Sequence, residues 1–328
     1  MSPSRDRPPV SRWPRGVAVL RGLPAGVRAR LRGRDLMLIA AGLTFYAGIA
    51  VVPLLVLSFG ITAWITSSQR VRELGERVGD LLPGELGAPA ALDRLVEAGA
   101  GLDPLGALLA LLPMSLYGEG LRRALLRFSE RRHEGHTAWR GRLAALPLLL
   151  LAPVLLYPLL LAAAQMADLA DRGGALATTG QVALGYYAVL AALTLPLAWG
   201  FRVVGGGRVR WRSLLVGALF TAACLSGFLQ GFVLFLALPL DLGAPFGDLD
   251  VVGGVVALAL WLFLLHLVVL LGWLTTQTLD ELAGDRSAPR RRVGEPVEPG
   301  TGHLLAMSVN RIFGHDEGDR RQESVNLN

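Results

Sequence analysis

The stretch Leu36–Gln69, LMLIAAGLTFYAGIAVVPLLVLSFGITAWITSSQ, contains no Asp, Glu, Arg or Lys. A helix that crosses about 30 Å of hydrocarbon needs about 20 apolar residues, because each residue adds about 1.5 Å along the helix axis. This stretch is long enough. It also lacks the early position and the small-residue cleavage site of a signal peptide, so we expect a retained transmembrane helix.

Five further stretches share this lack of charge. They are Pro104–Gly118, Leu143–Ala167, Gly173–Phe201, Ser213–Leu240 and Val251–Leu279. The whole chain is 52% apolar and only 18% charged, which is unusual for a soluble protein. We therefore expect an all-α integral membrane protein with six transmembrane helices. The predicted spans are 36–66, 104–125, 143–167, 178–201, 213–240 and 251–279, within a membrane domain of residues 36–283.

The second stretch is shorter than the others. It can span the membrane if Leu121 and Leu125 extend the helix while Arg122 and Arg123 reach the headgroups. The alternative is a re-entrant or surface helix.

Arginine is distributed unevenly between the spans. All 32 basic residues are Arg, and 27 of them lie before the first stretch, after the second and fourth, or in the tail. The other connections hold five. The positive-inside rule then places both termini in the cytoplasm, and an odd number of spans would put Arg-rich segments on both sides. These bands would face anionic lipids, so we expect membrane lipids, and no nucleic acid, as partners of this chain.

The segments that flank the first span carry their own patterns. Residues 1–35 form an Arg-rich cytoplasmic segment, in which Val27 and Leu31 share one face of a predicted interfacial helix over Pro24–Arg34. In the outer loop Ser67–Asp103, apolar residues recur every three or four positions. They predict two short amphipathic helices that lie on the outer leaflet or cap the bundle. Residues 284–328 read as a disordered cytoplasmic tail.

Catalytic signatures are missing from the sequence. Without Lys there is no Walker A loop and no Schiff-base lysine, and neither His-Glu-x-x-His nor Gly-x-Ser-x-Gly occurs. Cys224 is the only cysteine, so no disulfide forms within one chain, and we expect it to be a packing residue. His133 and His136 have no convincing third metal ligand nearby. We expect no enzyme activity, no cofactor and no metal site.

A few polar residues interrupt the spans. His266 lies near the middle of the last one, where it is either a neutral side chain bonded to a neighbouring helix or a cavity-lining, proton-linked group. Gln230 lies between Gly227 and Gly231, whose spacing favours close helix packing. Tyr46, Gln230 and His266 are our candidate cavity-lining residues.

Proline occurs within several spans. Pro53 and Pro196 lie in the first and fourth, and Pro147, Pro153 and Pro158 in the third. Each removes a backbone hydrogen bond and bends its helix. Bent helices can enclose a cavity or can simply pack. No predicted span carries an acidic residue deep inside, which weakens the case for a cation-coupled carrier.

Four motifs resemble those of a known family. They are Ala40–Ala47 with Pro53–Leu55, Gly120–Leu125, Arg208–Arg212 with Gly217-Ala218, and Gly253 with Trp261-Leu262 and Leu270–Gly272. In this order, over roughly residues 25–283, they resemble the YihY/BrkB family of bacterial inner-membrane proteins. The resemblance implies six helices in the cytoplasmic membrane and a link to envelope integrity or lipid handling. It supplies no agreed substrate and no catalytic residues.

The chain departs from that family at two places. Leu249-Asp250 stands where the family often has Tyr-Gly, and Gly272-Trp273-Leu274 stands where it often has Gly-Ala-Glu. A mechanistic role of that Glu is therefore in doubt in this chain. A ribonuclease activity attributed to the family finds no support in these residues.

These patterns favour a protein that binds a lipid or amphipathic solute or moves it between leaflets. The alternative is a non-catalytic scaffold whose Arg-rich segments recruit envelope proteins or further copies of the chain. An enzyme that acts on lipids is a third hypothesis. Candidate contacts to lipid headgroups are Arg122, Arg123, Arg210 and Arg212, which can otherwise serve only to anchor helix ends.

Overall fold

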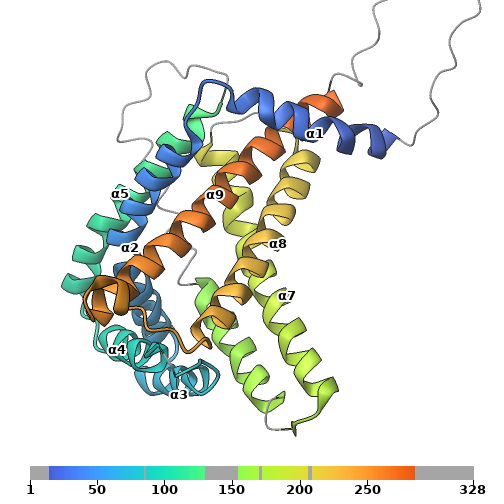
Figure 1. Ribbon diagram of the computed structural model, residues 1–328. Helices are drawn as coiled ribbons and strands as arrows, with labels where there is room; N and C mark the ends of the chain where they lie inside the picture. The colour runs from blue at the N-terminus through green and yellow to red at the C-terminus, as the bar shows by residue number, and fades with distance from the viewer. Residues whose placement is uncertain (1–14, 85, 130–153, 170–171, 206–208, 285–328) are drawn as a thin grey trace, which may run out of the picture. The chain divides into compact units, whose positions relative to one another are not determined.

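A computed structural model describes residues 15–84, 86–129, 154–169, 172–205 and 209–284 (Figure 1). Within these ranges the regular structure is helical and contains no strand. Five helices are long and apolar enough to cross a membrane, which confirms an all-α chain with several candidate spans. They are α2 (Leu36–Ile65), α5 (Pro104–Arg127), α7 (Ala175–Trp199) with its continuation η1 (Gly200–Val204), α8 (Trp211–Leu236) and α9 (Asp250–Gly284).

The predicted third span is described only in part. Its second half forms the apolar helix Val154–Leu169, and residues 143–153 lie outside the described ranges. The shorter second stretch forms a continuous helix to Arg127, so Leu121 and Leu125 extend it as expected, and both are buried. The count of six spans stays a prediction.

Polar residues at the edges of the uncharged stretches start the helices. Asp35 accepts a hydrogen bond from the Leu38 N–H (3.0 Å) at the start of α2. Asp103 accepts one from the Gly106 N–H (2.7 Å) at the start of α5. Each carboxylate satisfies a backbone donor that the first helical turn leaves unpaired. The charges that delimit the apolar stretches therefore also fix where these helices begin.

Small residues bring α8 and α9 together. A Cβ added at Gly217 of α8 would overlap the Thr276 side chain of α9, and one added at Gly272 of α9 would overlap Thr221 of α8. Each helix thus inserts a Thr into the gap left by a Gly on the other, at a four-residue spacing. The packing role expected for Gly227 is wrong, because a Cβ there would meet no atom within 4 Å.

Helix α1 (Arg15–Leu31) packs against the end of α9. Gly26 faces Thr278, and Gly22 faces Leu282, which lies 3.2 Å from the position of an added Cβ. The helix begins nine residues before the predicted Pro24 and contains that proline. The predicted apolar face, Val27 and Leu31, packs against the main core cluster of the protein.

Two short helices follow α2, as the apolar spacing predicts. They are α3 (Ser68–Gly79) and α4 (Ala88–Ala100). Val71 of α3 and Val96 of α4 are buried with Phe59 of α2 and with Leu160 of the helix Val154–Leu169. The two helices therefore pack over one end of α2, and their position in a leaflet stays a prediction.

The described parts of the Arg-rich segments come together at the other end of α2. There α1 and the ends of α5 and α9 lie close together, and the turn after η1 joins them through Gly205 (Figure 1). This grouping agrees with the alternation of Arg along the sequence. Which end faces the cytoplasm stays a prediction.

Candidate functional site

A cavity of about 420 Å³ lies among the long helices. Its wall includes Ala50 of α2, Leu121 of α5, Leu193 of α7, Leu229 of α8 and Leu265 of α9, and the helix Val154–Leu169 contributes as well. The described lining residues are apolar except for two that carry polar side-chain groups, Tyr117 of α5 and His266 of α9. The helices thus enclose an apolar space with one polar position on its wall.

His266 is buried, with 4% of its surface exposed, and has three hydrogen-bonding neighbours. Its Nδ1 lies 2.6 Å from the Leu262 carbonyl oxygen and 3.3 Å from Thr44 Oγ1 on α2. Its Nε2 lies 3.2 Å from the Tyr117 hydroxyl oxygen. The imidazole therefore joins α9 to α2 and α5 at the cavity wall.

The chemistry of the neighbouring groups assigns the hydrogens of this network. A carbonyl oxygen only accepts, so Nδ1 carries a proton and donates it to Leu262. The Thr44 hydroxyl donates to the Ala40 carbonyl oxygen at 2.9 Å, so toward His266 it acts as an acceptor. A charged imidazole in this apolar wall, with no acidic group among its three neighbours, would be costly, so His266 is neutral. Nε2 then accepts, and the Tyr117 hydroxyl donates to it. His266 thus bonds to neighbouring helices and also lies on the cavity wall, and a proton-linked role for it stays a prediction.

The other two candidate cavity residues lie elsewhere. The Tyr46 ring packs on Gly120, where an added Cβ would come within 2.7 Å of it. Gln230 points toward Gly185 of α7, with its Nε2 3.3 Å from the position of an added Cβ. Neither is among the described residues that line the cavity.

Tyr117 was not predicted from the sequence. The signal available for it, a hydroxyl in an uncharged stretch, is shared by Ser115.

The π-helix η1 forms part of the cavity wall through Gly200 and Phe201. It follows Pro196, whose missing N–H interrupts the regular helical hydrogen bonds of α7. The Gly205 N–H donates to the Gly200 carbonyl oxygen (2.8 Å), five residues earlier. Such π-bulges occur frequently at functional sites.

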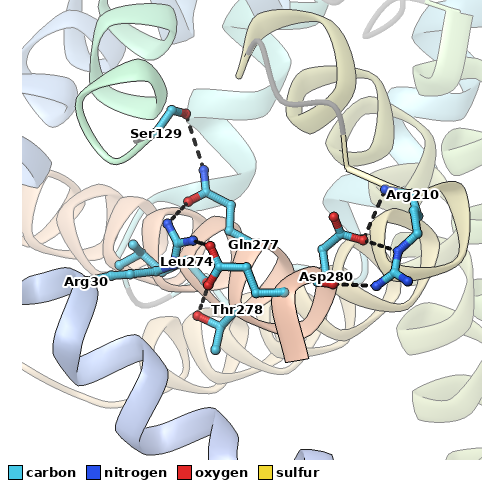
Figure 2. Close-up of polar contacts among 8 residues, drawn as sticks. Arg30, Ser129, Arg210, Leu274, Gln277, Thr278 and Asp280 are labelled. Atoms are coloured by element: carbon cyan, nitrogen blue, oxygen red, sulfur yellow. Dashed lines mark hydrogen bonds and ion pairs between the residues drawn. The ribbon is translucent and has the colours of Figure 1, made fainter. Parts of the chain in front are cut away.

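A polar cluster holds the end of α9 (Figure 2). Arg30 of α1 donates to Gln277 Oε1 at 2.5 Å and forms an ion pair with Glu281. Gln277 in turn donates to Ser129 Oγ (3.3 Å), and Ser129 donates to the Gly205 carbonyl oxygen (3.2 Å). The cluster connects α1, α9, the end of α5 and the turn after η1.

Arg210 holds the same end of α9 from a second direction. Its Nε donates to Asp280 Oδ1 at 2.8 Å, its backbone N–H donates to the same oxygen at 3.2 Å, and its Nη2 donates to the Asp280 carbonyl (Figure 2). Arg212, two residues later, is exposed. Of these two headgroup candidates, Arg210 therefore already has an acidic partner within the chain.

Arg122 and Arg123 share one carboxylate. Glu119 lies on α5, three residues before Arg122 and four before Arg123, and its side chain is only 7% exposed. It accepts from Arg122 Nε at 3.2 Å and from Arg123 Nε at 2.8 Å. From the sequence we expected no acidic residue deep inside a span. That expectation overlooks Glu119, which directly follows the uncharged stretch Pro104–Gly118. The headgroup role of the arginines stays a prediction, and a lipid phosphate would have to compete with Glu119 for them.

The described residues contain no group of three or more His, Cys, Asp or Glu side chains that could hold a metal ion. His133 and His136 lie outside the described ranges.

Comparison with known proteins identifies a family. A family model described as "Virulence factor BrkB" matches residues 27–295. No curated protein and no solved structure matches the chain. The matched range contains all five candidate spans, the cavity and both clusters at the end of α9. By the family match and its long apolar helices, the chain belongs to the virulence factor BrkB family and is a multi-pass membrane protein.

Proposed function

We propose that this protein binds a lipid or amphipathic solute in its central cavity and moves it between the leaflets of the bacterial cytoplasmic membrane. In this proposal the protein supports the envelope without catalysis, and both of its termini are cytoplasmic. The observation that carries the proposal is the cavity of about 420 Å³ with an almost wholly apolar wall. Its volume falls within the range of about 300–1,000 Å³ that is typical of ligand sites.

The chemistry of the wall supports an amphipathic ligand over an ion. No described lining residue is Asp, Glu or Arg, and the two polar ones hydrogen-bond to each other. A bare ion in such a space would lose its hydration without compensation, which is costly. An alkyl chain loses nothing comparable.

Reconstitution into liposomes with fluorescent lipids tests the transfer step. We expect the protein to accelerate exchange of the labelled lipid between leaflets. Leu229→Trp should slow this exchange because the larger ring fills the cavity. Leu215→Trp on the same helix is the matched control, since Leu215 is 51% exposed and is not among the described lining residues.

Two results would reject the proposal. One is exchange no faster than in empty liposomes together with no co-purified lipid. The other is equal exchange by the unsubstituted protein and Leu229→Trp. Stable protein partners recovered by crosslinking, without lipid exchange, would favour the scaffolding alternative.

A further inference from the structure

We infer that the cavity selects an uncharged ligand with a hydroxyl group on an otherwise apolar body, and that Tyr117 recognises this hydroxyl. The inference rests on the proposed function and narrows it to a substrate class. It comes from two properties of the cavity wall, its charge and its hydrogen bonds.

The part of the wall that the structure describes offers no partner for a charged headgroup. The described lining residues include no Arg. Four arginines near the helix ends contact Glu119, Glu281 or Asp280 instead, namely Arg30, Arg122, Arg123 and Arg210. A phosphate or carboxylate in the cavity would therefore be buried without an opposite charge, and that cost is large. This property disfavours an anionic headgroup inside the cavity, although such a headgroup can still bind at the surface.

Among the described polar groups at the wall, the hydrogen bonds use the available donors and leave an acceptor, the Tyr117 oxygen. His266 Nδ1–H is used by the Leu262 carbonyl, and His266 Nε2 is used by the Tyr117 hydroxyl hydrogen. The Thr44 hydroxyl hydrogen is used by Ala40. The Tyr117 oxygen keeps acceptor capacity, because a phenolic oxygen has lone pairs in addition to its hydrogen.

A ligand that pairs with this oxygen must bring a hydrogen-bond donor. An alcohol has one, whereas an ether or a ketone of the same shape has none. The wall therefore distinguishes a hydroxyl from other uncharged oxygen groups. Apart from Tyr117 and His266, the described lining residues that the rest of the ligand would meet are apolar, among them Leu193, Leu229 and Leu265.

The test uses photo-crosslinking probes with one alkyl chain, one diazirine and four different ends. The ends are an alcohol, its methyl ether, a carboxylate and a phosphate. The full-length protein is placed in nanodiscs of uncharged lipid, irradiated with each probe, and mapped for adducts by mass spectrometry. We expect the alcohol to label cavity-lining residues most, and excess unlabelled alcohol to compete.

Tyr117→Phe removes the acceptor and keeps the ring. Loss of one hydrogen bond should lower labelling by the alcohol about two- to tenfold and leave labelling by the ether unchanged. Tyr187→Phe is the matched control, since Tyr187 is 65% exposed on α7 and is not among the described lining residues. The alcohol-to-ether ratio in the unsubstituted protein gives the same answer without any variant.

The outcomes separate this inference from the proposed function. Cavity labelling in which the ether equals the alcohol, or in which the phosphate exceeds it, would overturn the inference and leave a cavity that binds amphiphiles. Alcohol labelling unchanged by Tyr117→Phe would overturn the role of Tyr117. No cavity adduct from any probe would overturn the proposed function as well.

Discussion

Gly217 and Gly272 lie where α8 and α9 come closest. Each leaves room for a threonine of the other helix, and Thr221 and Thr276 direct their hydroxyls to the backbone of their own helices, at 2.7 Å in both cases. In a lipid environment apolar burial drives helix association only weakly, so close packing has a larger share of the stabilisation. The Gly-x-x-x-Thr pattern on both helices is therefore a better marker of this interface than the Gly-x-x-x-Gly pair at Gly227 and Gly231.

Gly217→Ala tests this interface at a single residue. The new methyl group would overlap Thr276, so we expect α8 and α9 to separate slightly and stability to fall by about 1–3 kcal/mol. Gly227→Ala makes the same change in open space, and there alanine should stabilise the helix by about 0.5–1 kcal/mol. The midpoint temperature of thermal unfolding in detergent compares the two. If both variants shift it in the same direction, the close approach at Gly217 is not what stabilises the pair.

Arg30 connects the first helix to the last one. Its side chain is only 8% exposed, and it contacts both Gln277 and Glu281 of α9. The charged guanidinium of Arg30 donates to the neutral amide of Gln277 and pairs with the carboxylate of Glu281. Hydrogen bonds that involve a charged group stabilise a fold more than neutral ones do. We therefore expect Arg30, in addition to the apolar face of Val27 and Leu31, to hold α1 in position.

Arg30→Gln should loosen α1 while leaving the central helices intact. We expect faster hydrogen–deuterium exchange of the α1 amides, corresponding to a loss of about 1–3 kcal/mol of local stability. Arg28→Gln is the control, because Arg28 is an exposed residue on the same helix. Equal exchange of α1 in the two variants would show that the ion pair with Glu281 does not hold the helix.

Arg72 and Glu97 connect α3 to α4 through two hydrogen bonds, Nε to Oε1 at 2.7 Å and Nη2 to Oε2 at 3.2 Å. The hydrogen bonds from Arg72 lower the pKa of Glu97 below its ordinary value of 4.5. A carboxyl group whose pKa is lower in the folded state stabilises that state above its unfolded pKa. The stabilisation is lost as pH falls through the lowered folded value.

The sign of this linkage gives a pH-dependent prediction. Glu97→Gln should lower the unfolding temperature slightly at neutral pH, because both side chains are exposed and the pair is screened by water. The difference from the unsubstituted protein should shrink as the pH drops below 4.5. Glu76→Gln, which neutralises an exposed carboxylate on α3, provides the comparison. A difference that is the same at neutral and acid pH would rule out the ionic link.

The uncharged stretches predict where most long helices lie, since charge and capping residues mark their edges. The first predicted span, 36–66, differs from α2 by one residue. The last helix continues to Gly284, past the predicted end at residue 279. Its extra turn carries Asp280 and Glu281, which pair with Arg210 and Arg30. Apolar periodicity carries no information on such partners, so the sequence could not predict this extension.

The same limit applies to the candidate site. A histidine in the last span is visible in the sequence as an expensive group that needs a partner. Its partner Tyr117 is 149 residues away, and without the helix arrangement nothing distinguishes it from other hydroxyl residues. Gln230 and His266 look alike as candidates in sequence. Only the packing of α8 against α7 turns Gln230 toward Gly185.

At the scale of the whole molecule, the described parts of the Arg-rich segments come together at one end of α2, and the helices α3 and α4 pack at the other. Arg-rich and Arg-poor connections alternate along the sequence. If they lie at opposite ends, each long apolar segment must cross from one end to the other. This alternation therefore predicts the sidedness of every connection, including those on either side of the helix Val154–Leu169. The positive-inside rule assigns the Arg-rich end to the cytoplasm.

Cysteine labelling in spheroplasts tests this topology directly. Cys224 is the only natural cysteine, so a Cys224→Ser background carries no other thiol. Gln69→Cys and Arg172→Cys should react with a membrane-impermeant maleimide from outside. Arg28→Cys on α1 and Arg212→Cys at the start of α8 should react only after the membrane is permeabilised, because both lie at the Arg-rich end. A reversed pattern would invert the orientation.

Labelling of Arg172→Cys only after permeabilisation, with Gln69→Cys labelled from outside, would mean an odd number of crossings between these two positions. In that case either α5 or the segment that ends in Val154–Leu169 does not span, and the six-helix topology would be wrong.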